Sequence, residues 1–200
     1  MNKKRIIYIL IFSIFILFAM ATKVAAKDTD RILNYVVTVE PRMNDGTLDI
    51  IYEITWKVLD SDSEGPLRWL QIGTPNSYFD EPKALTNNIK TISKYNGSYV
   101  KIVFNQLYYE GDELTFKYRI HQPYMYKLSF GNCKYSFTPA WFTNAKIDNL
   151  TIKWNKDKVK SSNNQKTEGN YLIWNKKNLA NGGKLTVNVK YSENAFRIFK

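Results

Sequence analysis

The sequence contains one cysteine, Cys133, and one histidine, His121, among its 200 residues. A single cysteine excludes an intramolecular disulfide framework and any zinc site built from several cysteines. A single histidine excludes a histidine-rich metal centre, and no local signature joins it to Cys133 as a catalytic pair. The sequence also lacks a glycine-rich phosphate loop and a dinucleotide-binding fingerprint. We therefore predict that the protein is not an enzyme and has no catalytic residues.

Long apolar runs are also absent, except for one at the N-terminus. Residues 3–5 are basic, residues 6–21 are almost entirely apolar, and Val24 and Ala26 occupy the −3 and −1 positions of a cleavage site. This order is typical of a secretory signal peptide. The apolar run is shorter than the roughly 20 residues of a membrane-spanning helix. We expect residues 1–26 to form a helical signal peptide, or an uncleaved anchor, and the rest of the chain to be secreted and associated with the cell surface.

The charged residues are distributed unevenly along this basic protein. Residues 27–122 carry 11 basic and 14 acidic residues, whereas residues 123–200 carry 14 basic and 4 acidic residues. Such an excess predicts an anionic partner outside the cell, either a wall polymer or a lipid surface. Lysine also serves simply as a solvated surface residue, which is the alternative. Nucleic acid is not expected, because Arg197 is the only arginine in the basic half.

The mature sequence has the pattern of β-strands almost throughout. Apolar and polar residues alternate most clearly over residues 48–58, and the same period recurs over residues 113–121 and 184–191. Asp45-Gly46 and Asn96-Gly97 are strong hairpin signals, since both pairs accept positive φ angles. Weaker strands are predicted at residues 32–39, 67–72, 89–93, 99–105, 147–154 and 171–174.

These nine strands predict an all-β fold, since no helical pattern follows residue 26. We expect an antiparallel β-sandwich with Ig-like or jelly-roll character that spans residues 27–200 as one domain. The alternative is a division into residues 27–122 and a smaller basic unit at 123–200.

Four segments of the chain carry a resemblance to a known group of proteins. They read NDGTLDIIYEITWKV, LDSDSEGPLRWLQIGTPN, YYEGDELTFKYRIHQPYMY and FTPAWF. Together they resemble an uncharacterised family of secreted or membrane-anchored Gram-positive bacterial proteins with an extracytoplasmic β-sandwich domain of unknown function. The resemblance covers about residues 31–196. It implies the fold and the location, and it implies no catalytic or binding residues.

Two segments of the basic half are candidate binding regions. Residues 123–142 hold seven aromatic side chains and show little strand character. Tyr124, Tyr126 and Trp141 are therefore predicted to stack on a glycan. The alternative is that these rings close one end of the sandwich. Residues 155–169 are predicted to form a mobile hairpin loop, whose Lys156, Lys158 and Lys160 would bind an anionic ligand.

An acidic loop is the one candidate metal site. Asp60, Asp62 and Glu64 alternate before Gly65, like the opening of a calcium-binding loop. An EF-hand would require a glutamate at the twelfth position, where this chain has Gln71. The sequence thus leaves two alternatives, a Ca²⁺ site in a sandwich loop and a solvated acidic turn.

From these patterns we expect a non-catalytic exported β-sandwich that binds at the bacterial cell envelope. Its partner would be an anionic wall polymer, a glycan or a surface protein. A membrane contact would come only through an uncleaved N-terminal segment or surface charge. The first alternative is a carboxylate-based glycan hydrolase. The second is an assembly module whose edge strands pair with another envelope protein.

Overall fold

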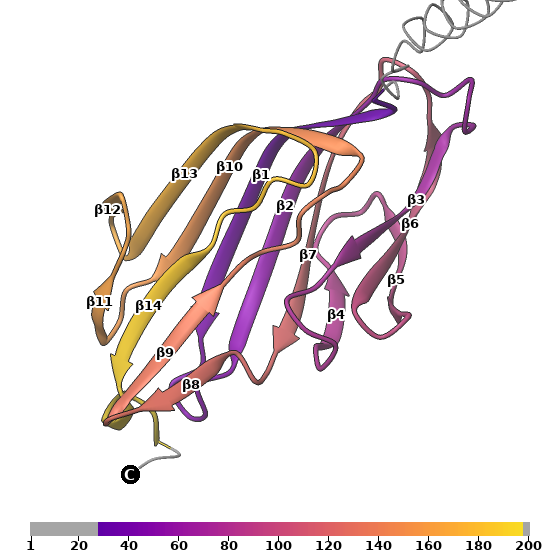
Figure 1. Ribbon diagram of the computed structural model, residues 1–200. Helices are drawn as coiled ribbons and strands as arrows, with labels where there is room; N and C mark the ends of the chain where they lie inside the picture. Colours follow the sequence, from indigo (N-terminus) through magenta and orange to yellow (C-terminus); the bar gives the residue numbers. More distant parts are fainter. Residues whose placement is uncertain (1–27, 198–200) are drawn as a thin grey trace, which may run out of the picture.

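A computed structural model describes residues 28–197, which fold almost entirely into β-strands (Figure 1). The strands number fourteen and form three sheets; a short 3₁₀ turn at Glu193–Ala195 follows the last of them. The all-β prediction is confirmed, whereas nine strands was too low a count. The predicted signal helix lies outside the described residues, and within them there is no helix that could cross a membrane.

The largest sheet has seven strands in the order β12-β13-β10-β1-β2-β7-β4. Its strands pair antiparallel except for β1 and β10, which run parallel with Asp30 opposite Ala145. The strands come from both sides of residue 122. Their bounds are β1 Asp30–Pro41, β2 Leu48–Val58, β4 Asp80–Ala84, β7 Glu113–Gln122, β10 Ala145–Asn155, β12 Lys166–Glu168 and β13 Tyr171–Leu179.

Two smaller sheets complete the fold. A four-stranded sheet has the order β11-β14-β9-β8 and a three-stranded sheet has the order β3-β6-β5, both with antiparallel pairing. The first comprises β8 Tyr126–Ser129, β9 Asn132–Phe137, β11 Val159–Ser162 and β14 Val187–Ser192. The second comprises β3 Leu67–Gly73, β5 Ile89–Tyr95 and β6 Tyr99–Tyr108.

Side-chain alternation gives the large sheet one buried face. In β2 every second residue from Leu48 to Val58 is buried, and the residues between them are only half-buried. In strand β7 every second residue from Leu114 to Ile120 is likewise buried, and the residues between them are exposed or half-buried. The alternation predicted for these two segments is therefore confirmed, and their buried side chains form the centre of the core.

Both small sheets cover this same face of the large sheet. Trp154 of β10 packs edge-on against Tyr135 and Phe137 of β9, with ring centroids 5.3 Å and 5.9 Å away. Further along the face, Phe104 of β6 packs against Phe116 of β7 at 5.2 Å. Figure 1 shows β9 and β14 in front of the large sheet and β3, β5 and β6 beyond β7.

Five short strands were not predicted. Residues 123–142 contain β8 and β9, and residues 155–169 contain β11 and β12, so the expectations of little strand character and of a hairpin loop were wrong. The fifth is β4, an edge strand with an irregular register against β7. All but β9 have three to five residues, which is too short for alternation to stand out from a loop.

One hydrogen bond joins the large sheet to the four-stranded sheet at a tight turn. Gly46, between β1 and β2, has φ +75°, and its carbonyl oxygen accepts a hydrogen bond of 2.7 Å from the Tyr135 hydroxyl. A Cβ atom at Gly46 would lie 3.0 Å from the hydroxyl oxygen of Tyr135 and 3.0 Å from Cε1 of Tyr126. This position therefore requires glycine both for its backbone angle and for its neighbours.

We predict that Gly46→Ala lowers the free energy of unfolding by about 2 kcal/mol, because it adds a steric conflict to the left-handed backbone penalty. Gly182→Ala is the matched control, since Gly182 has φ +74° and open space around it. The control should cost about 1 kcal/mol, from the backbone alone. Urea unfolding of both variants measures the difference, and equal losses would contradict the contact.

Candidate functional site

A row of lysines crosses the outer face of the four-stranded sheet. Lys190 of β14 lies opposite Lys134 of β9, and Lys134 lies opposite Lys127 of β8. Ser161 of β11 lies opposite Lys190 and extends the row to the fourth strand. Paired residues share a face, and neighbouring strands are about 5 Å apart. Three ammonium groups therefore emerge side by side from adjacent strands; we call Lys127, Lys134 and Lys190 the lysine row.

The orientation of the row follows from the alternation along each strand. Cys133, Tyr135, Val189 and Tyr191, the chain neighbours of Lys134 and Lys190, are all buried in the core. Their inward direction forces the lysines outward. The burial of Cys133 also removes its thiol from solvent.

The lysine row makes no ion pair within residues 28–197. Lys134 Nζ donates a hydrogen bond of 3.4 Å to the Ser129 hydroxyl, and the side chains of Lys127 and Lys190 form no hydrogen bond with the described part of the chain. Like charges directly opposite each other destabilise a sheet. The row therefore costs folding stability, which is the reason to look for a role outside folding.

A hollow of about 780 Å³ lies over the lysine row. Hydroxyl and amide groups line it together with the lysines; they belong to Ser129, Ser136, Ser161, Ser162, Asn163 and Asn188. Lys160 of β11 lies beside it, where its Nζ donates a 3.2 Å hydrogen bond to Asn132 Oδ1. Hydroxyl and amide groups can donate hydrogen bonds, as the ammonium groups do. The hollow thus offers many donors and positive charge, which suits an anionic ligand.

The structure brings only part of the predicted lysine group to this hollow. Lys156 and Lys158 are exposed in the turn between β10 and β11 and do not line the hollow; Lys160 lies at its edge. Sequence reasoning missed Lys127, Lys134 and Lys190. Their signal was the polar position within short alternating stretches, such as Cys133-Lys134-Tyr135-Ser136-Phe137.

The three predicted aromatic residues lie in different places. Tyr124 is exposed and packs edge-on against Tyr78, with ring centroids 5.0 Å apart. Tyr126 is half-buried and stacks on Phe196 at 6.4 Å. Trp141 lines a separate hollow of about 380 Å³ beside Trp56. No ring contact or hollow among residues 28–197 brings these three rings together, and glycan stacking by them stays a prediction.

The acidic loop forms a turn stabilised by its own backbone. Asp60 Oδ1 accepts hydrogen bonds from the backbone N–H groups of Asp62 at 3.0 Å and Ser63 at 3.2 Å. Among residues 28–197 no group of three or more His, Cys, Asp or Glu side chains is placed to hold a metal ion. Ca²⁺ binding by Asp60, Asp62 and Glu64 stays a prediction. Asp60 and Glu64 also line a hollow of about 410 Å³ with Asp30, so the carboxylate-based hydrolase stays a prediction as well.

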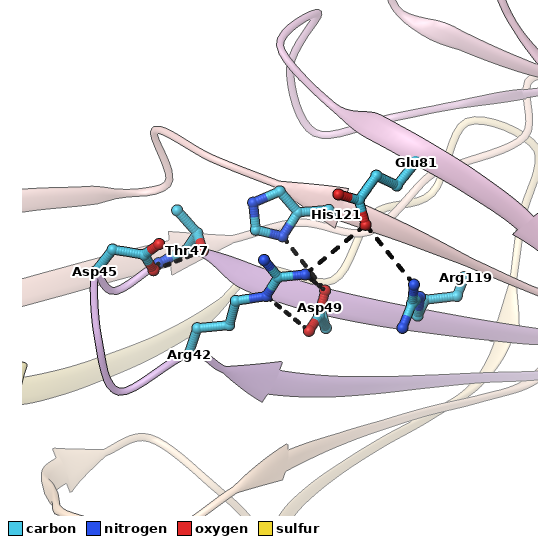
Figure 2. Close-up of polar contacts among 7 residues, drawn as sticks. All are labelled: Arg42, Asp45, Thr47, Asp49, Glu81, Arg119 and His121. Atoms are coloured by element: carbon cyan, nitrogen blue, oxygen red, sulfur yellow. Dashed lines mark hydrogen bonds and ion pairs between the residues drawn. The ribbon is translucent and has the colours of Figure 1, made fainter.

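His121 belongs to a polar cluster on the outer face of the large sheet (Figure 2). Arg42 donates two hydrogen bonds of 2.9 Å to the Asp49 carboxylate, and His121 Nδ1 lies 3.3 Å from Asp49 Oδ1. Glu81 lies 3.9 Å from Arg42 and 3.8 Å from Arg119. His121 is therefore hydrogen-bonded and only 8% exposed.

This polar cluster is explained by strand pairing. Asp49 lies directly opposite His121 across β2 and β7, and Arg42 is the first residue of the β1–β2 turn. Burial raises the pKa of Asp49, but the hydrogen bonds and the charge of Arg42 outweigh burial, so the pKa lies below the usual value of 3.8. The cluster therefore stabilises the fold and leaves the lysine row as the candidate functional site.

Comparisons with known proteins give a fold but no family. No family model matches the sequence, and no curated protein is significantly similar to it. The chain is similar to the M1 zinc metallopeptidase from Deinococcus radiodurans, with a TM-score of 0.53 and 10% identity over 82% of this chain and 42% of that chain. A two-domain M1 zinc metallopeptidase variant bound to L-arginine gives a TM-score of 0.51 and 11% identity over 82% and 43%.

This chain thus spans less than half the length of the metallopeptidase chains that it matches. At this level of identity the likeness concerns the fold alone, and the activity of those enzymes carries no information about this chain.

We predict that Asp49→Asn lowers the free energy of unfolding by about 1 kcal/mol at pH 7. This is the contribution expected of a bidentate arginine–carboxylate ion pair that solvent partly screens. Because folding lowers the pKa of Asp49, the stabilisation is present above the pKa of the unfolded chain. It is lost as the pH falls through the lower pKa of the folded state. The difference between wild type and variant should therefore hold from pH 7 to about 5 and shrink below about 4.

Urea unfolding over a pH series measures this dependence. Asp62→Asn is the control, since the Asp62 side chain is exposed and has no ion pair within the described part of the chain. A difference for Asp49→Asn that does not change with pH would show that the charge of Asp49 is not what stabilises the cluster.

Proposed function

We propose that this chain is a non-catalytic exported β-protein that binds an anionic polymer of the bacterial cell envelope through the lysine row. The observation that carries the proposal is the alignment of Lys127, Lys134 and Lys190 on three adjacent strands, without an ion pair in residues 28–197, beneath a hollow rich in donors. In the free protein the ammonium groups of the lysine row repel one another. A bound anion would replace this repulsion by attraction.

The direction of the row favours a polymer over a small anion. The lysines follow one another across the strands at intervals of about 5 Å, so a single phosphate or carboxylate would contact only one or two of them. A chain with regularly spaced anionic groups could engage all three at once and gain from multivalency. Such a chain would lie perpendicular to β8, β9 and β14.

The location at the envelope rests on the N-terminal sequence. Residues 1–26 have the order of a secretory signal, and the resemblance to secreted Gram-positive proteins agrees with it. We also propose that the large sheet and its two covering sheets constitute one sandwich-like domain, which the packing of Trp154 and Phe116 supports. The hydrolase and the assembly module have no comparable observation in their favour.

The test is sedimentation of the chain lacking residues 1–26 with intact cell walls, with walls stripped of anionic polymer, and with anionic vesicles. We predict that replacing Lys127, Lys134 and Lys190 together by Gln weakens binding to intact walls roughly tenfold to hundredfold at 0.1 M salt. Binding of the wild-type chain should also fall with salt, because the screening length drops from about 10 Å at 0.1 M to about 3 Å at 1 M.

Two matched triple variants make the result specific. Replacement of Lys83, Lys90 and Lys176, exposed lysines of other sheets, removes the same charge and should leave binding nearly unchanged. Replacement of Lys156, Lys158 and Lys160 tests the turn chosen from sequence. Wall binding that survives the loss of the lysine row, or that persists on stripped walls, would contradict the proposal. Preferential binding to vesicles would replace the polymer by a lipid surface.

A further inference from the structure

A second hollow, of about 380 Å³, lies between the three-stranded sheet and the segment that leads into β10. Aromatic rings from three separate parts of the chain wall it: Trp56 of β2, Tyr99 of β6, and Trp141 with Phe142 before β10. Tyr99 is 43% exposed and Trp141 is 41% exposed, so part of this aromatic wall faces solvent. The carboxylate of Asp30 is part of the lining and is its only charged group among the described residues; neutral polar residues such as Gln71, Thr74 and Asn144 also line the hollow.

Asp30 is a partly buried carboxylate that has no basic partner among residues 28–197. Trp56 Nε1 donates a 2.7 Å hydrogen bond to Asp30 Oδ1, and the Thr29 hydroxyl lies 3.4 Å from Oδ2. No basic side chain within residues 28–197 forms an ion pair with it, and the charged group that acts on it is another carboxylate, Glu64. Burial accordingly raises the pKa of Asp30.

Other acidic residues near Asp30 in the sequence or in the sheet do have cations. Asp28 pairs with Lys146 at 2.7 Å, and Asp148 pairs with Arg31 at 2.9 Å. A carboxylate that is withdrawn from water and left beside a second carboxylate is destabilised unless a positive charge joins it. Of the two hollows that Asp30 lines, the one of about 380 Å³ with the aromatic wall is where such a charge would enter.

The aromatic wall is also suited to a positive charge. The face of an indole ring attracts cations, most strongly where water is partly excluded. In this protein Lys184 Nζ already lies 3.8 Å from the ring centroid of Trp141. That contact shows that this ring accepts an ammonium group on one of its faces.

We propose that this hollow binds an organic ammonium group, which Asp30 neutralises and the rings of Trp56, Tyr99 and Trp141 surround. An anion would be repelled by Asp30 and Glu64, and a neutral sugar would leave the carboxylate uncompensated. The volume fits a small amine. The site is independent of the lysine row, which selects the opposite charge.

Two kinds of ammonium share this chemistry and can be separated. A primary amine would donate a hydrogen bond to Asp30, whereas a quaternary ammonium would rely on the rings and on charge alone. Calorimetric titration with butylamine and with choline distinguishes them. 3,3-Dimethyl-1-butanol, a neutral molecule with the shape of choline, isolates the contribution of charge.

We expect saturable binding of at least one of the two amines and at least tenfold weaker binding of the neutral alcohol. Asp30→Asn should reduce amine affinity roughly tenfold or more. The amide can still accept the Trp56 hydrogen bond, so the variant should fold, as thermal unfolding would verify. Trp141→Leu should weaken binding several-fold. Asp157→Asn, at the other end of β10, is the matched charge control and should bind like the wild type.

Four results would overturn the proposal. The first is the absence of saturable binding by either amine in the accessible concentration range. The second is binding of the neutral alcohol as tight as that of choline, which would make the hollow merely apolar. The third is an N-acetylglucosamine disaccharide that binds more tightly than either amine and keeps its affinity in Asp30→Asn, which would assign the rings to sugar stacking. A folded Asp30→Asn variant with unchanged amine affinity would remove Asp30 from the site.

Discussion

One-sided burial of the seven-stranded sheet is the constraint on which the rest of the fold depends. Every second residue of β2 and β7 is buried, so a broad apolar face must be covered along its whole width. Neither small sheet covers both the Trp154 region and the Phe116 region; each region has its own covering sheet. Because these sheets bury only their inner faces, packing does not fix which side chains stand on their outer faces, and those faces can hold binding residues.

The outer faces of the large sheet and of the four-stranded sheet differ in how charged residues are paired across neighbouring strands. On the large sheet, Lys57 lies opposite Glu113 and Glu53 opposite Lys117, with ion-pair distances of 2.9 Å and 3.3 Å. On the four-stranded sheet, lysine lies opposite lysine. Complementary pairs stabilise a sheet and like-charged pairs do not. Folding stability therefore explains the lysine–glutamate pairs of the large sheet, whereas it does not explain the lysine row.

The sequence predicted the long elements because their alternation persists over many residues. Nine predicted strands correspond to β1, β2, β3, β5, β6, β7, β10, β13 and β14, and the bounds of β2 match residue for residue. Strands β8 and β9 were missed because their aromatic residues were interpreted as a binding segment. The same stretch alternates from Cys133 to Phe137 and turns at Phe130 and Gly131, both with positive φ.

The candidate site was harder to predict, for a different physical reason. Lys127, Lys134 and Lys190 are far apart in sequence and meet only through the pairing of β8, β9 and β14, whose register no local pattern specifies. Lys156, Lys158 and Lys160 attracted attention because they are close in sequence. Asp30 could not be predicted as a site for a similar reason. That it forms no ion pair within residues 28–197 depends on where every basic side chain of the folded chain lies.

The parallel pairing of β1 with β10 has a consequence for how the protein reaches its folded state. Strand β1 is central to the large sheet, yet its partner on one side begins at Ala145, opposite Asp30. A contact between such distant parts of the chain closes a long loop, and proteins rich in such contacts fold slowly. The β1–β2 hairpin can form early, but one edge of β1 stays unpaired until β10 exists.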